Sequence, residues 1–208
     1  MVQKSNSRSI ATLPPRVRRY DARRDGILRA AARIFRERGF TDTGMRDIAV
    51  AADLSPANLY HYFSGKDEIL FYCQDRALDR MMAGVVQARR STARADERLA
   101  AVLTTHVLTM LDEVEGATAH LQVDALSPGL REQIVKKRDR YERAVRRLVS
   151  DGVASGAFVA GDAALLTRAM LGALNWVVTW YRPDGALTPQ KIAGELAAYL
   201  VRGMVKRG

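Results

Sequence analysis

The spacing of apolar residues along this chain predicts a series of amphipathic α-helices. Over residues 21–38, apolar side chains recur three and four positions apart, which places them on one face of a helix. Similar spacing continues to the end of the chain, and no segment alternates apolar and polar residues as a half-buried strand does. We expect helices over residues 21–38, 45–52, 56–62, 64–90, 96–115, 117–125, 128–155, 162–181 and 189–204. The fold class is therefore predicted to be all-α.

The stretch from Thr43 to Leu70 has the pattern of two short helices joined by a tight turn, with a third helix after them. Asp53 interrupts the first apolar stripe, and Leu54 is expected to fill the turn. Ser55 and Pro56 open the second helix, because a serine hydroxyl accepts a backbone N–H at a helix start and proline lacks that N–H. Ser64 is expected to cap the third helix in the same way. This arrangement predicts a helix-turn-helix, a DNA-binding motif.

In such a motif the N-terminal end of the second helix meets the edges of the bases. Asn58 can pair with adenine through two hydrogen bonds, and the small Ala57 can approach a thymine methyl group. Leu59 and Phe63, four residues apart, can point inward. Base contacts are therefore expected from Ser55, Pro56, Ala57 and Asn58. The alternative for the whole stretch is a packed helical corner that binds no nucleic acid.

This stretch resembles the DNA-binding signature of the TetR family of transcriptional regulators. The matching residues are Thr43, Arg46, Ile48, Ala49, Ala52, Leu54, Ser55, Leu59, Tyr60, Tyr62, Phe63 and Lys66. Two positions depart from the family pattern: Gly44 replaces a common Thr or Ser, and Asp53 replaces a common Gly, although Asp tolerates a left-handed backbone. The motif predicts phosphate contacts from Thr43, Arg46, Tyr60, His61, Tyr62 and Lys66.

The net charge of the chain changes this picture by suggesting an anionic partner. The chain carries 33 Lys and Arg against 23 Asp and Glu, a formal net charge of +10. Residues 1–24 hold seven of these cations and one acid, and the N-terminal 20 residues are predicted to be a disordered basic arm. Such an arm is either a solvated tail or a segment that follows DNA phosphates or enters the minor groove. The expected organisation is an arm over 1–20, a helix-turn-helix domain over 21–66 and a helical domain over 67–208.

The cysteine count and the hydropathy indicate a cytoplasmic protein without membrane contact. A single cysteine, Cys73, excludes an internal disulfide and suits a reducing compartment. Cys73 lies on an apolar stripe, so a buried thiol is expected. No apolar run reaches the ~18 residues of a membrane span, and the N-terminus lacks the apolar segment of a signal peptide.

The C-terminal half is expected to supply a dimer interface and a ligand pocket. The helix over 162–181 is apolar on several sides, so with the final helix it would form a four-helix bundle with a second copy of the chain. The family resemblance implies the same homodimer, which would present two recognition helices to half-sites ~34 Å apart. Pocket candidates are His106, Met110, His120, Trp176 and Trp180, and plain core packing is the alternative for each. The histidines and the cysteine lack metal-ligand spacing, so neither a metal nor another cofactor is expected.

The C-terminal segments WYRPDGALTPQKIA and RDRYERAVRRLVSDGVASGAF resemble, more weakly, TetR-family members that respond to acyl-CoA thioesters. An acyl chain needs an apolar tunnel, and a CoA headgroup needs cations at its mouth. Candidate cations are Lys136, Lys137, Arg138, Arg140, Arg143, Arg146 and Arg147. The alternative is that this basic run is a solvated helix face.

The function expected from these features is a sequence-specific transcriptional regulator, most simply a repressor that binds operator DNA and is released by a small hydrophobic or acyl-CoA effector. The helix over 64–90 would link the two modules. The sequence has no nucleophile with a partner base, no glycine-rich phosphate loop and no paired carboxylates, so an enzyme is not expected. The competing class is an architectural, nucleoid-type DNA-binding protein that uses the same fold without an effector.

Overall fold

The computed structural model describes residues 15–112 and 122–205 of the chain. The predicted all-α class is confirmed, and within the described residues only an isolated bridge between Phe158 and Val205 has β-type pairing. The N-terminal domain contains α1 (Pro15–Arg38), α2 (Met45–Ala51) and α3 (Pro56–Tyr60), and α4 (Lys66–Arg90) follows it. The C-terminal domain contains α5 (Ala95–Leu111), η2 (Val123–Ala125), α7 (Pro128–Ala154), α8 (Ala163–Asn175), α9 (Val177–Trp180) and α10 (Pro189–Arg202).

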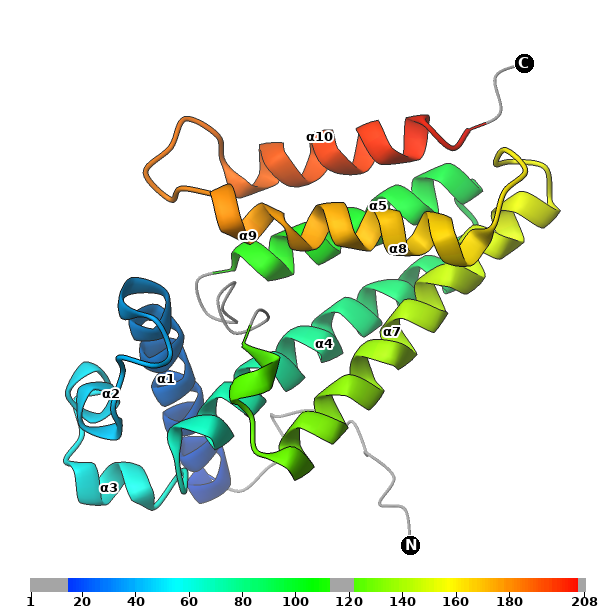
Figure 1. The fold of residues 1–208 in the computed structure, drawn as a ribbon. Helices are drawn as coiled ribbons and strands as arrows, with labels where there is room; N and C mark the ends of the chain where they lie inside the picture. Colours follow the sequence, from blue (N-terminus) through cyan, green and yellow to red (C-terminus); the bar gives the residue numbers. More distant parts are fainter. Residues whose placement is uncertain (1–14, 113–121, 206–208) are drawn as a thin grey trace, which may run out of the picture.

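The N-terminal domain lies at one end of the molecule, and α4 leads from it into the C-terminal helices (Figure 1). α4 runs beside α7, while α5 packs against α4 on one side and α10 on the other. The apolar stripe predicted for the third helix is buried along α4, at Ile69, Leu70, Cys73, Ala77, Leu78 and Met81. One helix therefore contributes to the packing of both domains.

The first helix begins earlier than predicted. Residues 15–20, assigned to the disordered arm from their polarity, form the first turns of α1. Pro15 suits this position because a helix start needs no backbone N–H there. The stacking of Tyr20 on Tyr62, with ring centroids 5.0 Å apart, gives these turns a tertiary contact that their sequence does not reveal. Residues 1–14, which carry the rest of the predicted arm, lie outside the described residues.

Other helix boundaries differ from the predicted ones because of local hydrogen bonds. The expected helix over 162–181 is divided at Trp176, where Thr179 N–H bonds to the Trp176 carbonyl three residues back. Ser55 accepts a helix-starting N–H as predicted, and Thr188, which also precedes a proline, does the same. Ser127 precedes Pro128 at the start of α7, but its side chain makes no such hydrogen bond. Ser64 does not cap α4, which starts after Gly65. Its N–H and hydroxyl instead donate to the Glu68 carboxylate.

Within the described residues, no helix is long and apolar enough to cross a membrane.

The end of α7 is packed too tightly for any side chain at Gly152. A Cβ atom there would lie 2.2 Å from ring carbons of Phe158, which is 2% exposed. The chain returns to this point because Gly156 adopts a φ of +74° and Phe158 N–H bonds to the Gly152 carbonyl. The close approach of this ring to the helix backbone therefore depends on a glycine.

Replacing Gly152 with alanine should lower the free energy of unfolding by about 1–3 kcal/mol, because the Phe158 ring must move out of a filled core. The matched control is Gly129→Ala on the same helix, where a Cβ meets nothing within 4 Å. Urea unfolding of both variants would check this. Equal midpoints for the two variants would contradict the packing argument.

Candidate nucleic-acid interface and interior cavity

The helix-turn-helix is held in shape by its turn. Asp53 adopts a left-handed backbone with a φ of 53°, and Leu54 N–H bonds back to the Ala49 carbonyl at 2.9 Å. Arg23 of α1 donates to the Asp53 carbonyl at 2.8 Å, which fixes the turn to the first helix. Leu59 and Phe63 are 0% and 1% exposed, so α3 is anchored by its inner face as predicted.

The four residues predicted to contact bases lie together at the exposed start of α3. Ser55, Pro56, Ala57 and Asn58 are all exposed. The Ser55 hydroxyl accepts the Asn58 backbone N–H at 3.2 Å, which leaves the Asn58 side chain outside this cap. Their role in base contact stays a prediction, and the geometry leaves their side chains accessible to the edge of a DNA groove.

The residues predicted to contact phosphates divide into two groups. Arg46, Tyr60 and His61 are exposed beside the turn and α3, and Tyr62 is half-buried against Tyr20. These four side chains are at least partly accessible, and their contact with a DNA backbone stays a prediction.

Thr43 and Lys66 are turned inward, against the expectation for phosphate contacts. Thr43 is 1% exposed, and its hydroxyl donates to the Gly39 carbonyl at 2.7 Å. The Lys66 ammonium donates to the carbonyls of Phe40, Thr41 and Thr43 at 2.9, 3.2 and 3.0 Å. An ammonium group has three N–H donors, so these bonds use all of them. Both residues therefore stabilise the loop between α1 and α2 rather than presenting a charge or hydroxyl to DNA.

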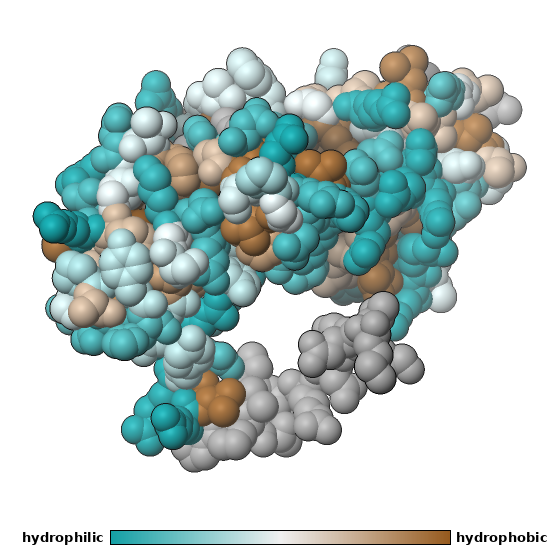
Figure 2. All heavy atoms as spheres, turned by 60° about the horizontal axis from the view of Figure 1, so that its bottom comes forward, coloured by the Kyte–Doolittle hydropathy of each residue, from teal (hydrophilic) through white to brown (hydrophobic). Residues whose placement is uncertain are grey.

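The structure adds a basic edge at the start of α1, part of which was predicted to belong to the arm. Arg16, Arg18, Arg19 and Arg23 are exposed at the start of α1, which the Tyr20–Tyr62 stack holds beside the end of α3. In Figure 2, much of the visible surface of the molecule is hydrophilic, and the apolar atoms lie in separate patches. Exposed guanidinium groups next to a recognition helix extend the surface that can neutralise phosphates.

The C-terminal domain contains a cavity of about 570 Å³ between α4, α5, α7 and α8. Leu78 and Met81 of α4 and Met110 of α5 form an apolar floor, and Leu171 of α8 adds to it. On the open side, between α7 and α8, the exposed residues Asp139, Arg168 and Gly172 line the mouth. The mouth and the floor thus differ in polarity.

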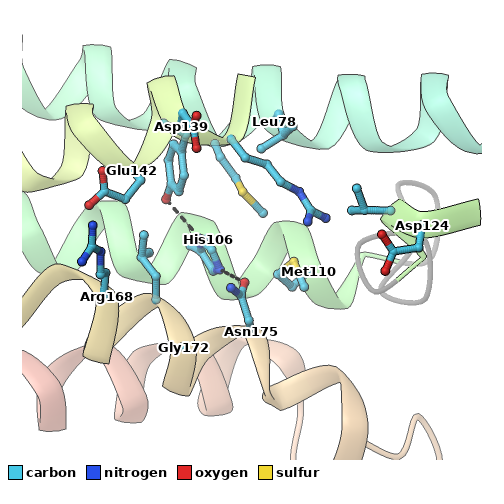
Figure 3. A pocket seen from close by; sticks show the side chains of 14 residues that line it. Leu78, His106, Met110, Asp124, Asp139, Glu142, Arg168, Gly172 and Asn175 are labelled. Carbon is cyan, nitrogen blue, oxygen red and sulfur yellow. Dashed lines mark hydrogen bonds between the residues drawn. The ribbon is translucent and has the colours of Figure 1, made fainter. Parts of the chain in front are cut away.

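A chain of hydrogen bonds crosses this cavity, from the buried Tyr141 and His106 to the exposed Asn175 (Figure 3). His106 lies between Tyr141 and Asn175, with its Nδ1 3.1 Å from the tyrosine hydroxyl and its Nε2 3.1 Å from the asparagine Oδ1. Because Oδ1 only accepts, Nε2 carries the proton and Nδ1 accepts from Tyr141. Burial lowers the pKa of His106 to about 4, although the bond to Asn175 opposes this, and burial raises the pKa of Tyr141. The side chains of His106 and Tyr141 are therefore both uncharged at neutral pH.

The charged residues of the cavity are of both signs. Asp124, Asp139 and Glu142 line it together with Arg138 and Arg168, and Figure 3 shows Glu142 and Arg168 facing each other across one side. Burial lowers the pKa of Arg138 from its ordinary value, and the nearby Asp124 opposes that shift. Of the seven cations proposed on α7, only Arg138 is part of the described lining. Lys137 instead pairs with Asp75 and Asp79 of α4.

Some of the residues predicted to line the pocket lie in the cavity, and others lie on the surface. His106 and Met110 line the cavity, whereas Trp176 and Trp180 do not and are 64% and 44% exposed. The tryptophans point outward because Met170, Leu171 and Leu174 occupy the inward face of α8. His120 lies outside the described residues. Tyr141 and Asn175 were missed, and only their helical register relative to His106 in the folded chain reveals them.

In the described part of the chain, no group of three or more His, Cys, Asp or Glu side chains is arranged to hold a metal ion.

Fold and site together define a DNA-binding regulator: an exposed recognition helix on a small domain, joined by one long helix to a domain with a cavity. Family comparisons agree with this class. Residues 27–73 match the model described as bacterial regulatory proteins, tetR family, and residues 92–204 match the tetracyclin repressor-like C-terminal domain. The chain belongs to the TetR family, whose members are transcriptional regulators.

Three relatives illustrate the similarity. The transcriptional repressor KstR2 of Mycobacterium tuberculosis is 28% identical over 195 residues, covering 90% of this chain and 96% of that protein. The structure of the TetR-family regulator PfmR from Thermus thermophilus is 35% identical, with a TM-score of 0.78 over 85% of this chain and 97% of that one. AibR in complex with isovaleryl coenzyme A and operator DNA is 26% identical, with a TM-score of 0.71 over 88% and 98% of the two chains.

Asn58→Ala should weaken binding to the preferred DNA sequence by about 1–3 kcal/mol and relax the preference at one base position. The reason is that its exposed amide at the start of α3 is placed to pair with a base edge. Selection of bound sequences from random DNA with each protein would measure this. An unchanged preference would remove Asn58 from the base-reading group, and Gln87→Ala on the exposed side of α4 controls for the loss of an amide.

Arg46 and Lys66 should differ in the salt dependence of DNA binding. Arg46→Ala should make the slope of log affinity against log salt shallower by about 1, because a phosphate contact is lost. Lys66→Met should keep the slope but lower the free energy of unfolding by about 1–3 kcal/mol, because three carbonyls lose their donor. A shallower slope in Lys66→Met would show that its ammonium does reach phosphate.

Proposed function

We propose that this protein is a ligand-responsive repressor that binds operator DNA as a homodimer and releases it when a small hydrophobic effector occupies the cavity. One observation carries this proposal. The floor of the cavity includes Leu78 and Met81 of α4, and the same helix begins at Lys66, directly after the recognition helix and its turn. An effector on this floor therefore contacts the element that positions α3.

The contacts of α4 support its role as the mechanical link. Arg76 pairs with Asp25 of α1, and the Cys73 thiol lies 3.9 Å from the Leu28 carbonyl of the same helix. At about 1.5 Å per residue, the 25 residues of α4 span ~37 Å. A small rotation of α4 at the cavity would therefore move the N-terminal domain with it.

An exposed apolar face on α8 and α10 supports the homodimer. Leu165 of α8 and Trp176, directly after that helix, are 66% and 64% exposed, and Tyr199 of α10 is 74% exposed. Small residues, including Ala169 and Ala198, lie exposed on the same two helices and would permit close helix contact. A second copy placed on this face completes a four-helix bundle and gives two recognition helices for the two half-sites of an operator.

The polarity of the cavity favours an effector with an apolar body and a polar group at the mouth. Arg138 and Arg168 can meet an anionic group there, but three carboxylates share the lining. The AibR complex contains an acyl-CoA thioester, and this likeness makes acyl-CoA the class to test first. Fewer cations of α7 are available to bind a CoA headgroup than the sequence suggested. Each of Lys136, Lys137 and Arg146 pairs with a nearby acidic side chain.

Octanoyl-CoA should weaken the affinity for operator DNA by a coupling of about 1–3 kcal/mol, and operator DNA should weaken octanoyl-CoA binding by the same factor. The operator is first selected from random DNA, and both affinities are then measured by titration. Free CoA and octanoate are the controls, since each keeps one half of the thioester. Identical octanoyl-CoA affinity with and without operator would contradict release by this class, and binding to unrelated DNA without preference would favour an architectural role.

A further inference from the structure

Gln74 is an unusual residue in the buried face of α4. It is 0% exposed, and neither its Oε1 nor its Nε2 has a hydrogen-bond partner. Among the other fully buried polar residues, Thr43, Thr109 and Thr167 donate to backbone carbonyls, and His106 has two partners. Arg24, Arg98 and Glu142 each have one buried side-chain atom without a partner, whereas Gln74 lacks a partner at both atoms of its amide. A buried amide without partners is costly, so its presence calls for a group that can pair with it.

The helical register places Gln74 on the same face of α4 as the cavity floor, one turn beyond the residues that line the cavity. At about 100° per residue, its side chain leaves α4 about 40° from Leu78 and about 20° from Met81, and so between the two residues of the floor. It lies ~6 Å along the axis from Leu78, on the side of the N-terminal domain. Its neighbours Cys73 and Asp75 face α1 and α7 instead, as their contacts show. Gln74 thus lies one turn beyond Leu78 on the same face of α4, in the core next to the floor rather than in the lining itself.

We propose that Gln74 recognises a hydrogen-bonding oxygen, a ketone or hydroxyl, at the buried end of the effector. The inference rests on the proposed function and deepens it by naming the effector class: an apolar chain or ring system that is oxygenated at the end remote from its polar head. A carbonyl oxygen accepts from the amide Nε2, and a hydroxyl pairs with either amide atom. A saturated tail leaves the amide unpaired, so the site discriminates against it.

The recognition is placed where it also affects α4. Gln74 lies between Cys73 and Arg76, which contact Leu28 and Asp25 of α1. An effector oxygen that bonds to Gln74 would therefore contact α4 in the same turn that contacts α1 of the N-terminal domain. An effector whose tail ends above Leu78 contacts only the upper part of the floor.

The test compares matched thioesters on matched variants. Hexanoyl-, octanoyl- and decanoyl-CoA are each titrated beside the analogue that carries a ketone on the carbon before the terminal methyl group. At the best chain length, the wild-type protein should bind the ketone about tenfold more tightly. Gln74→Met, which keeps the length of the side chain and removes the amide, should bind both within about twofold.

Gln87→Met is the control, because it makes the same substitution on an exposed position of the same helix and should retain the tenfold preference. Gln74→Leu serves as a second variant if the methionine variant does not fold. A preference that persists in the Gln74 variants overturns the inference, as does equal binding of ketone and plain thioester by the wild type at every length. If no thioester binds the wild type, the proposed acyl-CoA response falls and this inference falls with it.

Discussion

The packing of α4 into both domains is the constraint on which the rest of the structure depends. It packs against α1 of the N-terminal domain and against α5 and α7 of the C-terminal domain, so neither domain has a complete core without it. A helix resists bending because its backbone hydrogen bonds are continuous. The orientation of the recognition helix is therefore set by a rigid element whose other end is the floor of a cavity, and this shared element is what makes regulation at a distance physically possible.

The fold class and the motif could be predicted because they depend on local patterns. Apolar spacing gives helices, and Ser55-Pro56 and Thr188-Pro189 give helix starts whatever surrounds them. The roles of Thr43 and Lys66 could not be predicted, because they depend on carbonyl groups exposed by the loop between α1 and α2. A cation in a DNA-binding motif looks the same in sequence whether it faces a phosphate or a carbonyl.

The residues that line the cavity could also be predicted only in part. His106 and Met110, two of the pocket candidates, lie four residues apart on α5 and both line the cavity. Trp176 and Trp180 were assigned to the pocket by size and apolarity, but these properties suit a protein interface equally well. Only the rotation of α8 about its axis decides between the two, and that rotation results from the packing of Met170 and Leu174 against the rest of the domain.

The polar groups of the cavity give the proposed switch its energetic basis. A ligand shifts an equilibrium between two arrangements only by the difference in its affinities for them. A purely apolar floor would change little in affinity when α4 rotates slightly, because dispersion contacts are weakly directional. Hydrogen bonds between an effector and Asn175 of the lining, or Gln74 as proposed, depend strongly on distance and angle, so a small rotation of α8 or α4 would break or form them. A polar lining thus couples occupancy to the position of α4 more steeply than apolar burial alone.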